Sequence, residues 1–355
     1  MATTKAEVPS DMAGFTVGII GMGDMGKIVE AAAIDRVVAQ YGPSTKLGAI
    51  VGGQTSCKDP EIKAFEAHLP EDVDIVSCHS LHGPRVDPRD QPLVIIKHRS
   101  SAASAQKVET ILSCLNSKIV YLTAHEHDRI TADTQAVTHA AFLSMGKAWH
   151  ASQEFPWEGA RYVGGIENVK INLMLRIYSQ KWHVYAGLAI LNPEARKQIA
   201  QYAESTTELY KLMLGATSRS CGRASTTRVT ACSGAPASLG KMPESLLPNN
   251  HLSLLAMVDC WSALGIVPYD HMICSTPLFR LWLGVTETLF RNEQRLDEAI
   301  RVAIDDNTFR SDDLEFTFCC PRLGRATAAF FEPRIAEAME VGNAMVKAVL
   351  ESTKK

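Results

Sequence analysis

The sequence predicts an α/β Rossmann-like amino-terminal domain with a mostly parallel sheet, followed by an all-α carboxyl-terminal domain. Up to Thr123, short apolar strand-like runs alternate with helical segments, which is typical of a parallel α/β sheet. Beyond Thr123, nearly every segment has helical periodicity and little strand signal. We therefore expect a flexible terminus at residues 1–13, a sheet domain at 14–123 and a helical domain at 124–355.

The predicted strands end in glycine or polar residues, and helical stretches lie between several of them. The strand-like runs are "FTVGII" (15–20), "LGAIVGG" (47–53), "VDIVSCH" (73–79), "PLVIIKH" (92–98) and "KIVYLT" (118–123). The helical stretches are "EAAAIDRVVAQYG" (30–42), "PEIKAFEAHL" (60–69) and "AQKVETILSCLN" (105–116). In such a sheet, functional residues belong at the carboxyl ends of the strands.

The second domain is predicted to be a set of helices with two irregular interruptions. The helical stretches are 131–150, 169–191, 193–214, 251–264, 275–290 and 296–304. Residues 215–247 are rich in Ser, Thr, Gly, Ala and Arg without a period, and residues 317–329 are similar. We expect both stretches to be irregular, although long irregular loops are uncommon inside compact domains.

Composition limits the classes of protein that the chain can represent. It has 355 residues, 46% of them hydrophobic and 21% charged, which is typical of a globular protein rather than a disordered one. A net charge of −3 argues against a dedicated nucleic-acid binder. Without a long apolar run, we expect no membrane span. Nine cysteines without a CxxC motif, and a polar amino-terminal stretch, predict a cytoplasmic protein with reduced thiols.

A glycine-rich turn follows the first predicted strand and precedes a helix. Gly21, Gly23 and Gly26 form GxGxxG, in which glycines permit a tight turn and a close approach of the backbone to a pyrophosphate. The helix then presents free N–H groups to the phosphates. The alternative is a turn with no ligand. The acidic residue expected about 20 positions later for the ribose is absent. The residues assigned to a dinucleotide are Gly21, Met22, Gly23, Asp24, Met25 and Gly26.

Two polar groups follow predicted strands. His79 and His82 end the "VDIV" run, where a neutral imidazole can accept a proton from a substrate hydroxyl as hydride leaves the same carbon. Taken alone, structural turn histidines explain the pattern equally well. Ser56 ends another strand and can orient a hydrogen-bond network there, or cap a helix together with Thr55.

Further candidates lie in the helical domain. His125, His127 and His139 form a histidine-rich stretch, but they lack an HExxH pattern, so we expect no metal. Arg176 lies within an apolar helix face, where we expect it to be buried. A buried arginine needs an anionic partner, which is either a protein carboxylate or a substrate carboxylate.

Seven blocks, taken in order, resemble fungal-type prephenate dehydrogenases, which are NADP-dependent enzymes of tyrosine biosynthesis. The blocks are "GIIGMGDMG", "IVGGQTSC", "HSLHGP", "EHDRITADTQAVTHAAFLSMG", "LRIYSQKWHVYAGLAI", "PNNHLSLLAMVDCW" and "PYDHMICSTPLFRLWLGVTE". The resemblance implies a Rossmann-like domain, a helical domain used for homodimerisation, and oxidative decarboxylation of prephenate to 4-hydroxyphenylpyruvate with hydride transfer to NADP. It covers most of residues 14–214, 248–316 and 330–350.

The resemblance also implies roles for individual residues. His79 corresponds to the catalytic histidine that accepts a hydrogen bond from the substrate hydroxyl, and Ser56 corresponds to the active-site serine. Arg176 corresponds to the arginine that fixes a prephenate carboxylate. Gln135 and His139 are implied as supporting substrate contacts, one helical turn apart.

The chain departs from this family after the glycine turn, where Gly26 is followed almost directly by "IVEAAAIDRVVAQYG". The second and third strands of the sheet domain are apparently deleted, and with them the segment for the adenosine ribose and its 2′-phosphate. This deletion predicts weak or absent NADP binding. The join and the two irregular stretches suggest errors in the gene prediction, which transcript sequencing would test.

Two alternatives to an active prephenate dehydrogenase stay open. One is a catalytically inactive relative that retains only the helical dimerisation domain. The other is a different β-hydroxyacid-type dehydrogenase, which shares the two-domain plan. Such enzymes usually have a lysine-centred catalytic helix, whereas this chain offers His79 and Arg176.

Overall fold

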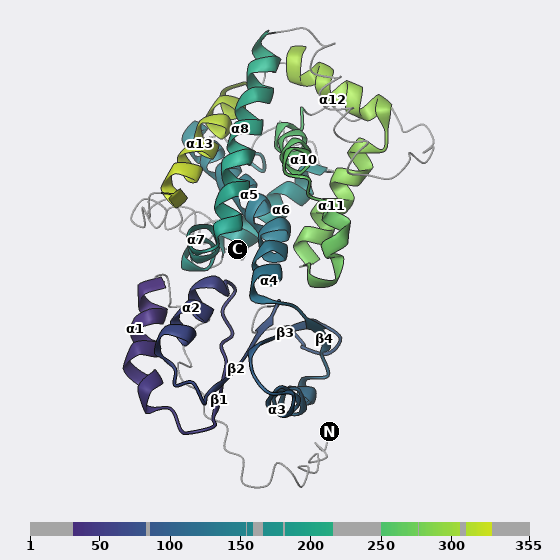
Figure 1. Ribbon diagram of the computed structural model, residues 1–355. Helices are drawn as coiled ribbons and strands as arrows, with labels where there is room; N and C mark the ends of the chain where they lie inside the picture. Colours follow the sequence, from purple (N-terminus) through teal and green to yellow (C-terminus); the bar gives the residue numbers. More distant parts are fainter. Residues whose placement is uncertain are drawn as a thin grey trace, which may run out of the picture.

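The fold consists of a sheet domain and a helical domain, in that order along the chain (Figure 1). The computed structural model describes residues 31–82, 86–153, 155–158, 166–179, 182–215, 250–275, 277–305 and 310–328. The predicted strand at 15–20 and the glycine turn lie outside these residues. None of the described helices is both long and apolar enough to cross a membrane.

The described part of the sheet domain keeps the predicted alternation of strands and helices. Its elements are α1 (Ala31–Tyr41), η2 (Gly42–Ser44), β1 (Ile50–Val51), α2 (Asp59–His68), β2 (Asp74–Ser80), β3 (Pro92–Arg99), α3 (Ala102–Leu112), η3 (Ser113–Leu115) and β4 (Lys118–Tyr121). Each of the four predicted strands within the described residues is present, as is each of the three helices.

The four strands form one sheet in the order β1-β2-β3-β4. β1 pairs parallel with β2 and β3 pairs parallel with β4, while β2 and β3 are antiparallel. The prediction of a mostly parallel sheet is therefore confirmed. Because β1 and β2 are parallel, their carboxyl ends lie at the same edge, where Gly52 and His79 follow or end a strand.

Helices cover both faces of this sheet. Ile75 of β2 packs with Ile62 and Phe65 of α2, whereas the next residue, Val76, packs with Ala105 of α3. Successive strand side chains point to opposite faces, so a central strand covered on both faces must be apolar throughout. This explains why "VDIV" and "LVII" are continuous apolar runs.

The helical domain begins at a well-defined boundary. Thr123 caps α4: its hydroxyl accepts from the N–H of Glu126, while the Glu126 carboxylate accepts from the N–H of Thr123 at 2.8 Å. The helices that follow are α4 (Ala124–Thr131), the π-helix η4 (Ala132–Ala136), α5 (Val137–Ser152), α6 (Ile166–Tyr178), α7 (Trp182–Leu191), α8 (Pro193–Gly215), α10 (Leu252–Leu264), η5 (Pro268–Cys274), α11 (Pro277–Phe290), α12 (Glu293–Asp305) and α13 (Arg310–Ala328).

α4, η4 and α5 run on without a break and form one long helical rod, residues Ala124–Ser152. The π turn in its middle is held by Asp133, whose carboxylate accepts from Nε2 of His271 at 2.8 Å and from Nε2 of Gln198. This buried contact joins the rod to η5 and α8. π turns are rare and occur frequently at functional sites.

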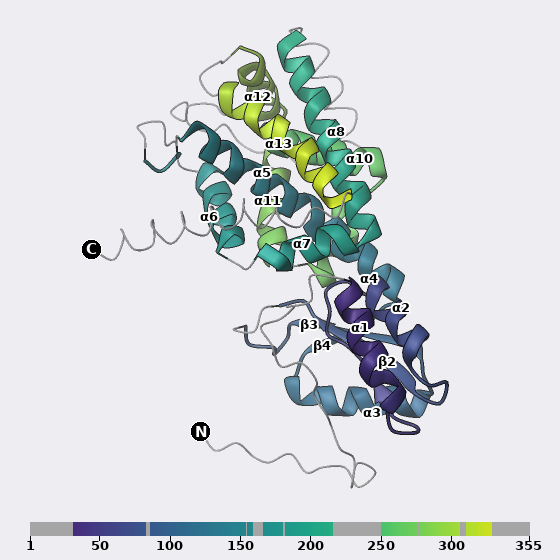
Figure 2. The same cartoon turned by 90° about the vertical axis from the view of Figure 1, so that its left-hand side faces the viewer.

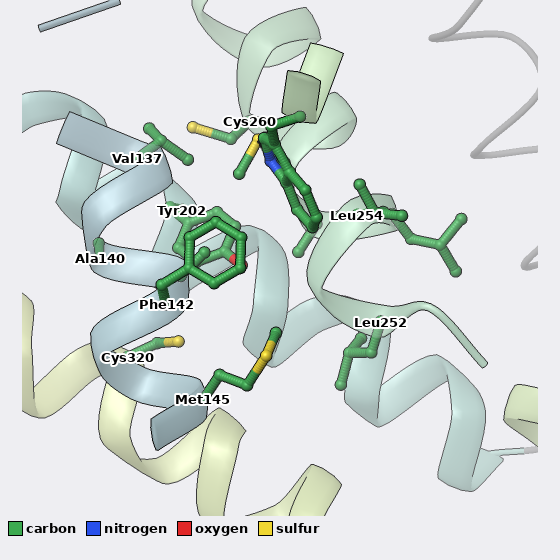
Figure 3. Packing of buried hydrophobic residues seen from close by; sticks show 14 of the residues in the cluster. Val137, Ala140, Phe142, Met145, Tyr202, Leu252, Leu254, Cys260 and Cys320 are labelled. Carbon is green, nitrogen blue, oxygen red and sulfur yellow. Dashed lines mark hydrogen bonds between the residues drawn. The ribbon is translucent and has the colours of Figure 1, made fainter. Parts of the chain in front are cut away.

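The core of the helical domain lies between α5, α8, α10 and α13 (Figure 3). Phe142 of α5, Tyr202 of α8 and Leu254 of α10 are completely buried there. Tyr202 satisfies its hydroxyl by donating to the carbonyl of Ser253 at 3.1 Å. An aromatic side chain with a satisfied polar group contributes a large buried apolar area to such a core without an unpaired donor.

Two of the predictions for this domain need correction. Residues 317–328 are not irregular but complete α13, which packs on α5 and α8 (Figure 2). Its low local helix propensity, with Pro321 inside the helix, is overridden because Phe316 and Cys320 are buried one turn apart. The single predicted helix at 169–191 is two helices, α6 and α7. Residues 216–247 lie outside the described part.

Candidate active site

His79 lies at the carboxyl end of β2, at the sheet edge where the sequence predicts a functional residue. Its side chain is buried, and its Nδ1 is 2.8 Å from Nε2 of His127 on α4. Nδ1 of His127 is in turn 2.8 Å from a carboxylate oxygen of Asp128. Three side chains that could exchange or orient a proton are thus connected in a row.

The carboxylate of Asp128 also anchors the amino terminus of α2. It accepts from the backbone N–H groups of Lys58, at 2.7 Å, and Asp59, at 2.8 Å. An anion is favoured there by the free N–H groups and the helix dipole. The backbone carbonyl of Asp128 accepts from Nδ2 of Asn192 at 2.8 Å. α4 is therefore fixed both to the sheet domain and to the end of α7.

A buried ion pair holds the loop between β1 and α2 against β2. Lys58 Nζ lies 3.0 Å from the carboxylate of Glu61 and donates to Ser77 Oγ and the carbonyl of Cys78, each at 2.9 Å. The Ser77 hydroxyl donates to the same Glu61 carboxylate. The loop approaches β2 so closely that a Cβ at Gly52 would lie 2.1 Å from the Val76 carbonyl oxygen. Ser56 lies half-buried in this loop.

The surroundings of His79 favour its neutral form. Burial lowers the pKa of His79 well below its ordinary value, and His127, Lys58 and His82 lower it further. A neutral imidazole at this position can accept a proton. The hydrogen bonds among the described residues do not include one between Ser56 and His79. The structure therefore joins His79 to His127, whereas the resemblance paired it with Ser56.

A second group of predicted residues lies further along the helical rod. The His139 ring packs edge-on against Tyr185 of α7, with ring centroids 4.6 Å apart. Its Nδ1 is buried without a hydrogen-bond partner, and burial lowers the pKa of His139 to about 4. Gln135, half-buried, lies one turn before it. His139 and Tyr185 line a narrow, mostly apolar pocket with Ala136, Ala140, Leu143, Leu188, Ala189, Ile199 and Leu323.

Arg176 is exposed on α6, so the expectation that it is buried is wrong. Its charge nevertheless acts on Tyr185: burial raises the pKa of Tyr185, and Arg176 partly opposes that rise. Arg176 is thus associated with the His139 pocket rather than with His79. His127 and His139 are separated by 139 − 127 = 12 positions of the rod, or about 18 Å at the rise of an α-helix.

The histidine-rich stretch divides into three separate environments. His125 is exposed, His127 contacts His79, and His139 contacts Tyr185. Within the described ranges, no group of three or more His, Cys, Asp or Glu side chains could hold a metal ion.

Reasoning from the sequence missed the pairing of His127 with Asp128. Both were visible as an adjacent His-Asp pair in the first turn after a helix cap that directly follows a strand. That position brings the pair to the strand-end edge of the sheet, which was the available signal.

A glycine turn ahead of a sheet with helices on both faces, a strand-end histidine and an all-helical second domain together define a two-domain nicotinamide-dependent dehydrogenase. Residues 136–232 and 235–325 match a family model of the 6-phosphogluconate dehydrogenase C-terminal domain. The chain is 54% identical over 360 residues to "Probable prephenate dehydrogenase [NADP(+)]" of Schizosaccharomyces pombe, covering 92% of this chain and 84% of that relative. The chain belongs to the family of fungal NADP-dependent prephenate dehydrogenases.

Two further relatives support this assignment. "Prephenate dehydrogenase [NADP(+)]" of Saccharomyces cerevisiae is 49% identical over 359 residues, covering 91% of this chain and 79% of that protein. "Probable arogenate/prephenate dehydrogenase" of Methanocaldococcus jannaschii is 26% identical over 183 residues, covering 50% and 41%. Another β-hydroxyacid-type dehydrogenase is thereby disfavoured. The family-model match also includes residues 215–232, 235–247 and 317–325, which the sequence blocks left outside the resemblance.

Proposed function

We propose that this chain oxidises prephenate to 4-hydroxyphenylpyruvate and CO2, with NADP as the hydride acceptor, in the pathway to tyrosine. The observation that carries this proposal is the buried, neutral His79 at the carboxyl end of β2, in a chain that is 54% identical to an NADP-dependent prephenate dehydrogenase. A neutral imidazole at the edge where β1 and β2 end is suited to accept the proton of a substrate hydroxyl.

In the proposed reaction, His79 takes the proton of the hydroxyl on the substrate ring. The C–H bond at the same carbon breaks with its electron pair, and the carbon becomes a carbonyl. The bond between the ring and its carboxylate then breaks to release CO2, and its electron pair makes the ring aromatic as the carbonyl becomes a phenol. NADP supplies the acceptor for the hydride.

The parallel ends of β1 and β2 fit a nicotinamide beside His79, because ligands of open α/β sheets bind outside the carboxyl ends of strands. Gly21, Met22, Gly23, Asp24, Met25 and Gly26 would hold the pyrophosphate through their backbone N–H groups. The short segment that follows Gly26 predicts weak NADP binding, so activity assays should use a large excess of NADP.

The His139 pocket supplies the proposed contacts to the remainder of the substrate. Arg176, with its charge near Tyr185, would pair with a carboxylate of prephenate at the open side of the pocket. His139, with an unpartnered buried nitrogen, and Gln135, one turn earlier, are proposed as supporting contacts. Ser56 is proposed to orient groups at the strand-end loop.

The proposal includes a homodimer formed through the helical domain and a cytoplasmic location. Leu314 and Phe318 are both exposed and lie one turn apart on α13, which supports a self-association surface. The seven cysteines within the described residues are free thiols, as is usual in a reducing compartment.

The decisive test is NADP reduction with prephenate, run for the wild-type chain and for His79→Asn. We expect NADPH and 4-hydroxyphenylpyruvate to form in equal amounts, and kcat to fall by about 10²- to 10⁴-fold in the variant, because the general base is lost. Absorbance of NADPH and chromatography of the product measure both. His125→Gln, at an exposed position on the same helix as His127, is the control and should retain full activity. An unchanged rate in His79→Asn would overturn the proposed role of His79.

A further inference from the structure

The hydrogen bonds around His79 determine which ring nitrogen of each histidine carries a proton. A carboxylate can only accept, so Nδ1–H of His127 donates to Asp128 across 2.8 Å. In a neutral His127, Nε2 is then an acceptor. Across the 2.8 Å contact, Nδ1–H of His79 must therefore donate to His127. The remaining ring nitrogen of His79, Nε2, is left with a free lone pair.

We propose that His127 and Asp128 are positioning residues that fix His79 in the tautomer with a bare Nε2 and receive the proton that its Nδ1 releases during the reaction. This inference rests on the proposed function of His79. It goes further by assigning a proton relay to two side chains, Asp128 and His127, that run in a line from the helix terminus to the sheet edge.

The step balances without any redox partner. As the substrate O–H bond breaks, a bond forms between that proton and Nε2 of His79. At the same time the Nδ1–H bond of His79 breaks and a bond forms between its proton and Nε2 of His127. His79 stays neutral, and His127 becomes an imidazolium beside the Asp128 carboxylate. For the next turnover, His127 returns its proton to His79 Nδ1, and water accepts the proton on Nε2.

The charges around the two histidines explain why the proton should move on. His79 faces His127 from α4, Lys58 from the loop before α2 and His82 from the loop after β2, and each of them disfavours a positive charge on it. His127 instead contacts the carboxylate of Asp128. A relay therefore transfers the positive charge from the side chain where it is disfavoured to one that has a counter-ion.

The relay is held rigidly, as positioning requires. Asp128 accepts from the N–H groups of Lys58 and Asp59, and its side chain is buried. His127 is also buried, with 1% of its surface exposed. Neither ring can rotate without breaking a hydrogen bond, so the tautomer is determined by the fold and does not depend on a bound substrate.

Two substitutions of His127 separate the two parts of the proposal. His127→Gln keeps an acceptor, its amide oxygen, for Nδ1–H of His79, but cannot take up a proton. His127→Phe removes the acceptor as well. We expect kcat to fall by about tenfold in His127→Gln and by at least about 100-fold in His127→Phe, with KM for prephenate little changed. The pH profile of kcat should shift in both variants.

Nitrogen NMR of protein labelled with ¹⁵N-histidine gives a readout that needs neither substrate nor NADP. In the wild-type chain we expect Nδ1 of His79 to carry the proton, with the same result in His127→Gln and a mixture of tautomers in His127→Phe. His125→Gln serves as the control and should leave both the spectrum of His79 and kcat unchanged.

Two outcomes would overturn the relay. Finding the proton on Nε2 of His79 in the wild-type chain does so even if a His127 variant fails to fold. Wild-type kcat and pH profile in both His127 variants would do so while His79→Asn is inactive, and the proposed function would then stand. If His79→Asn keeps full activity, the proposed function fails, whereas the NMR result still decides the tautomer.

Discussion

At the scale of single residues, burial sets the ionisation of the titratable side chains on and near the helical rod. His79 and His139 both have a lowered pKa, and burial is the largest cause for each. His79 is joined to His127, while Nδ1 of His139 has no partner in the part of the chain that the structure describes. The first is suited to exchange a proton and the second to meet a ligand.

His139 makes stability depend on pH. In the unfolded chain its pKa is near the ordinary 6.5, but in the folded chain it is about 4. Between these values the unfolded state binds more protons, so the free energy of unfolding falls as pH falls from 6.5 to 4. The loss is on the order of 3 kcal/mol.

Denaturant unfolding of the wild-type chain and His139→Gln over this pH range measures the effect. We expect a shallower dependence in the variant, while His125→Gln, at an exposed position, should match the wild type. Parallel curves for the wild type and His139→Gln would contradict the assigned shift.

At the scale of elements, the Lys58–Glu61 pair is what attaches the loop before α2 to β2. Lys58 is completely buried, and 2% of the Glu61 side chain is exposed. Replacing Lys58 by Met would leave a buried carboxylate without its cation, which typically costs about 3–5 kcal/mol. We expect the double variant Lys58→Met/Glu61→Leu to recover much of this loss, because no charge is then left unpaired.

A second ion pair in the same helix provides the matched control. Lys63 and Asp59 are 2.7 Å apart, but 73% of the Lys63 side chain is exposed. We expect Lys63→Met to change the free energy of unfolding by less than about 1 kcal/mol, since solvent screens such pairs. Equal losses in Lys58→Met and Lys63→Met would show that burial does not set the strength of the Lys58 pair.

The elements also show how far sequence reasoning reaches. β2 and β3 could be predicted because a strand buried on both faces leaves a continuous apolar run in the sequence. His79 at the end of β2 followed from that prediction. The contact with His127 could not be predicted, because it depends on α4 folding back to the sheet edge across 48 positions of the chain. α13 was missed because packing on α5 and α8 outweighs its weak local propensity.

At the scale of the whole molecule, the two domains meet where the chemistry is proposed to occur. α4 starts one residue after Thr123 caps it, contacts α2 and β3, and continues through η4 into the core of the helical domain (Figures 1 and 2). The boundary at residue 123 coincides with a helix cap, a feature that is legible in the sequence as Thr-x-x-Glu.

Homodimerisation is tested at this scale. We expect the wild-type chain to be a dimer, and the double variant Leu314→Glu/Phe318→Glu to shift towards monomer because two charges would be buried in the interface. Light scattering after size-exclusion chromatography measures the mass. Leu47→Glu, at an 82% exposed position in the sheet domain, should remain dimeric. A monomeric wild-type chain would refute the proposed dimer.

The long helical rod also constrains how this sequence can evolve. His127 and His139 lie on one continuous helix, and each extra or missing residue between them would turn one relative to the other by about 100° and move it about 1.5 Å along the axis. The π turn at Ala132–Ala136 already contains such an added residue. The stretch between the two histidines therefore acts as a ruler of fixed length, in which substitutions can be tolerated but insertions and deletions cannot.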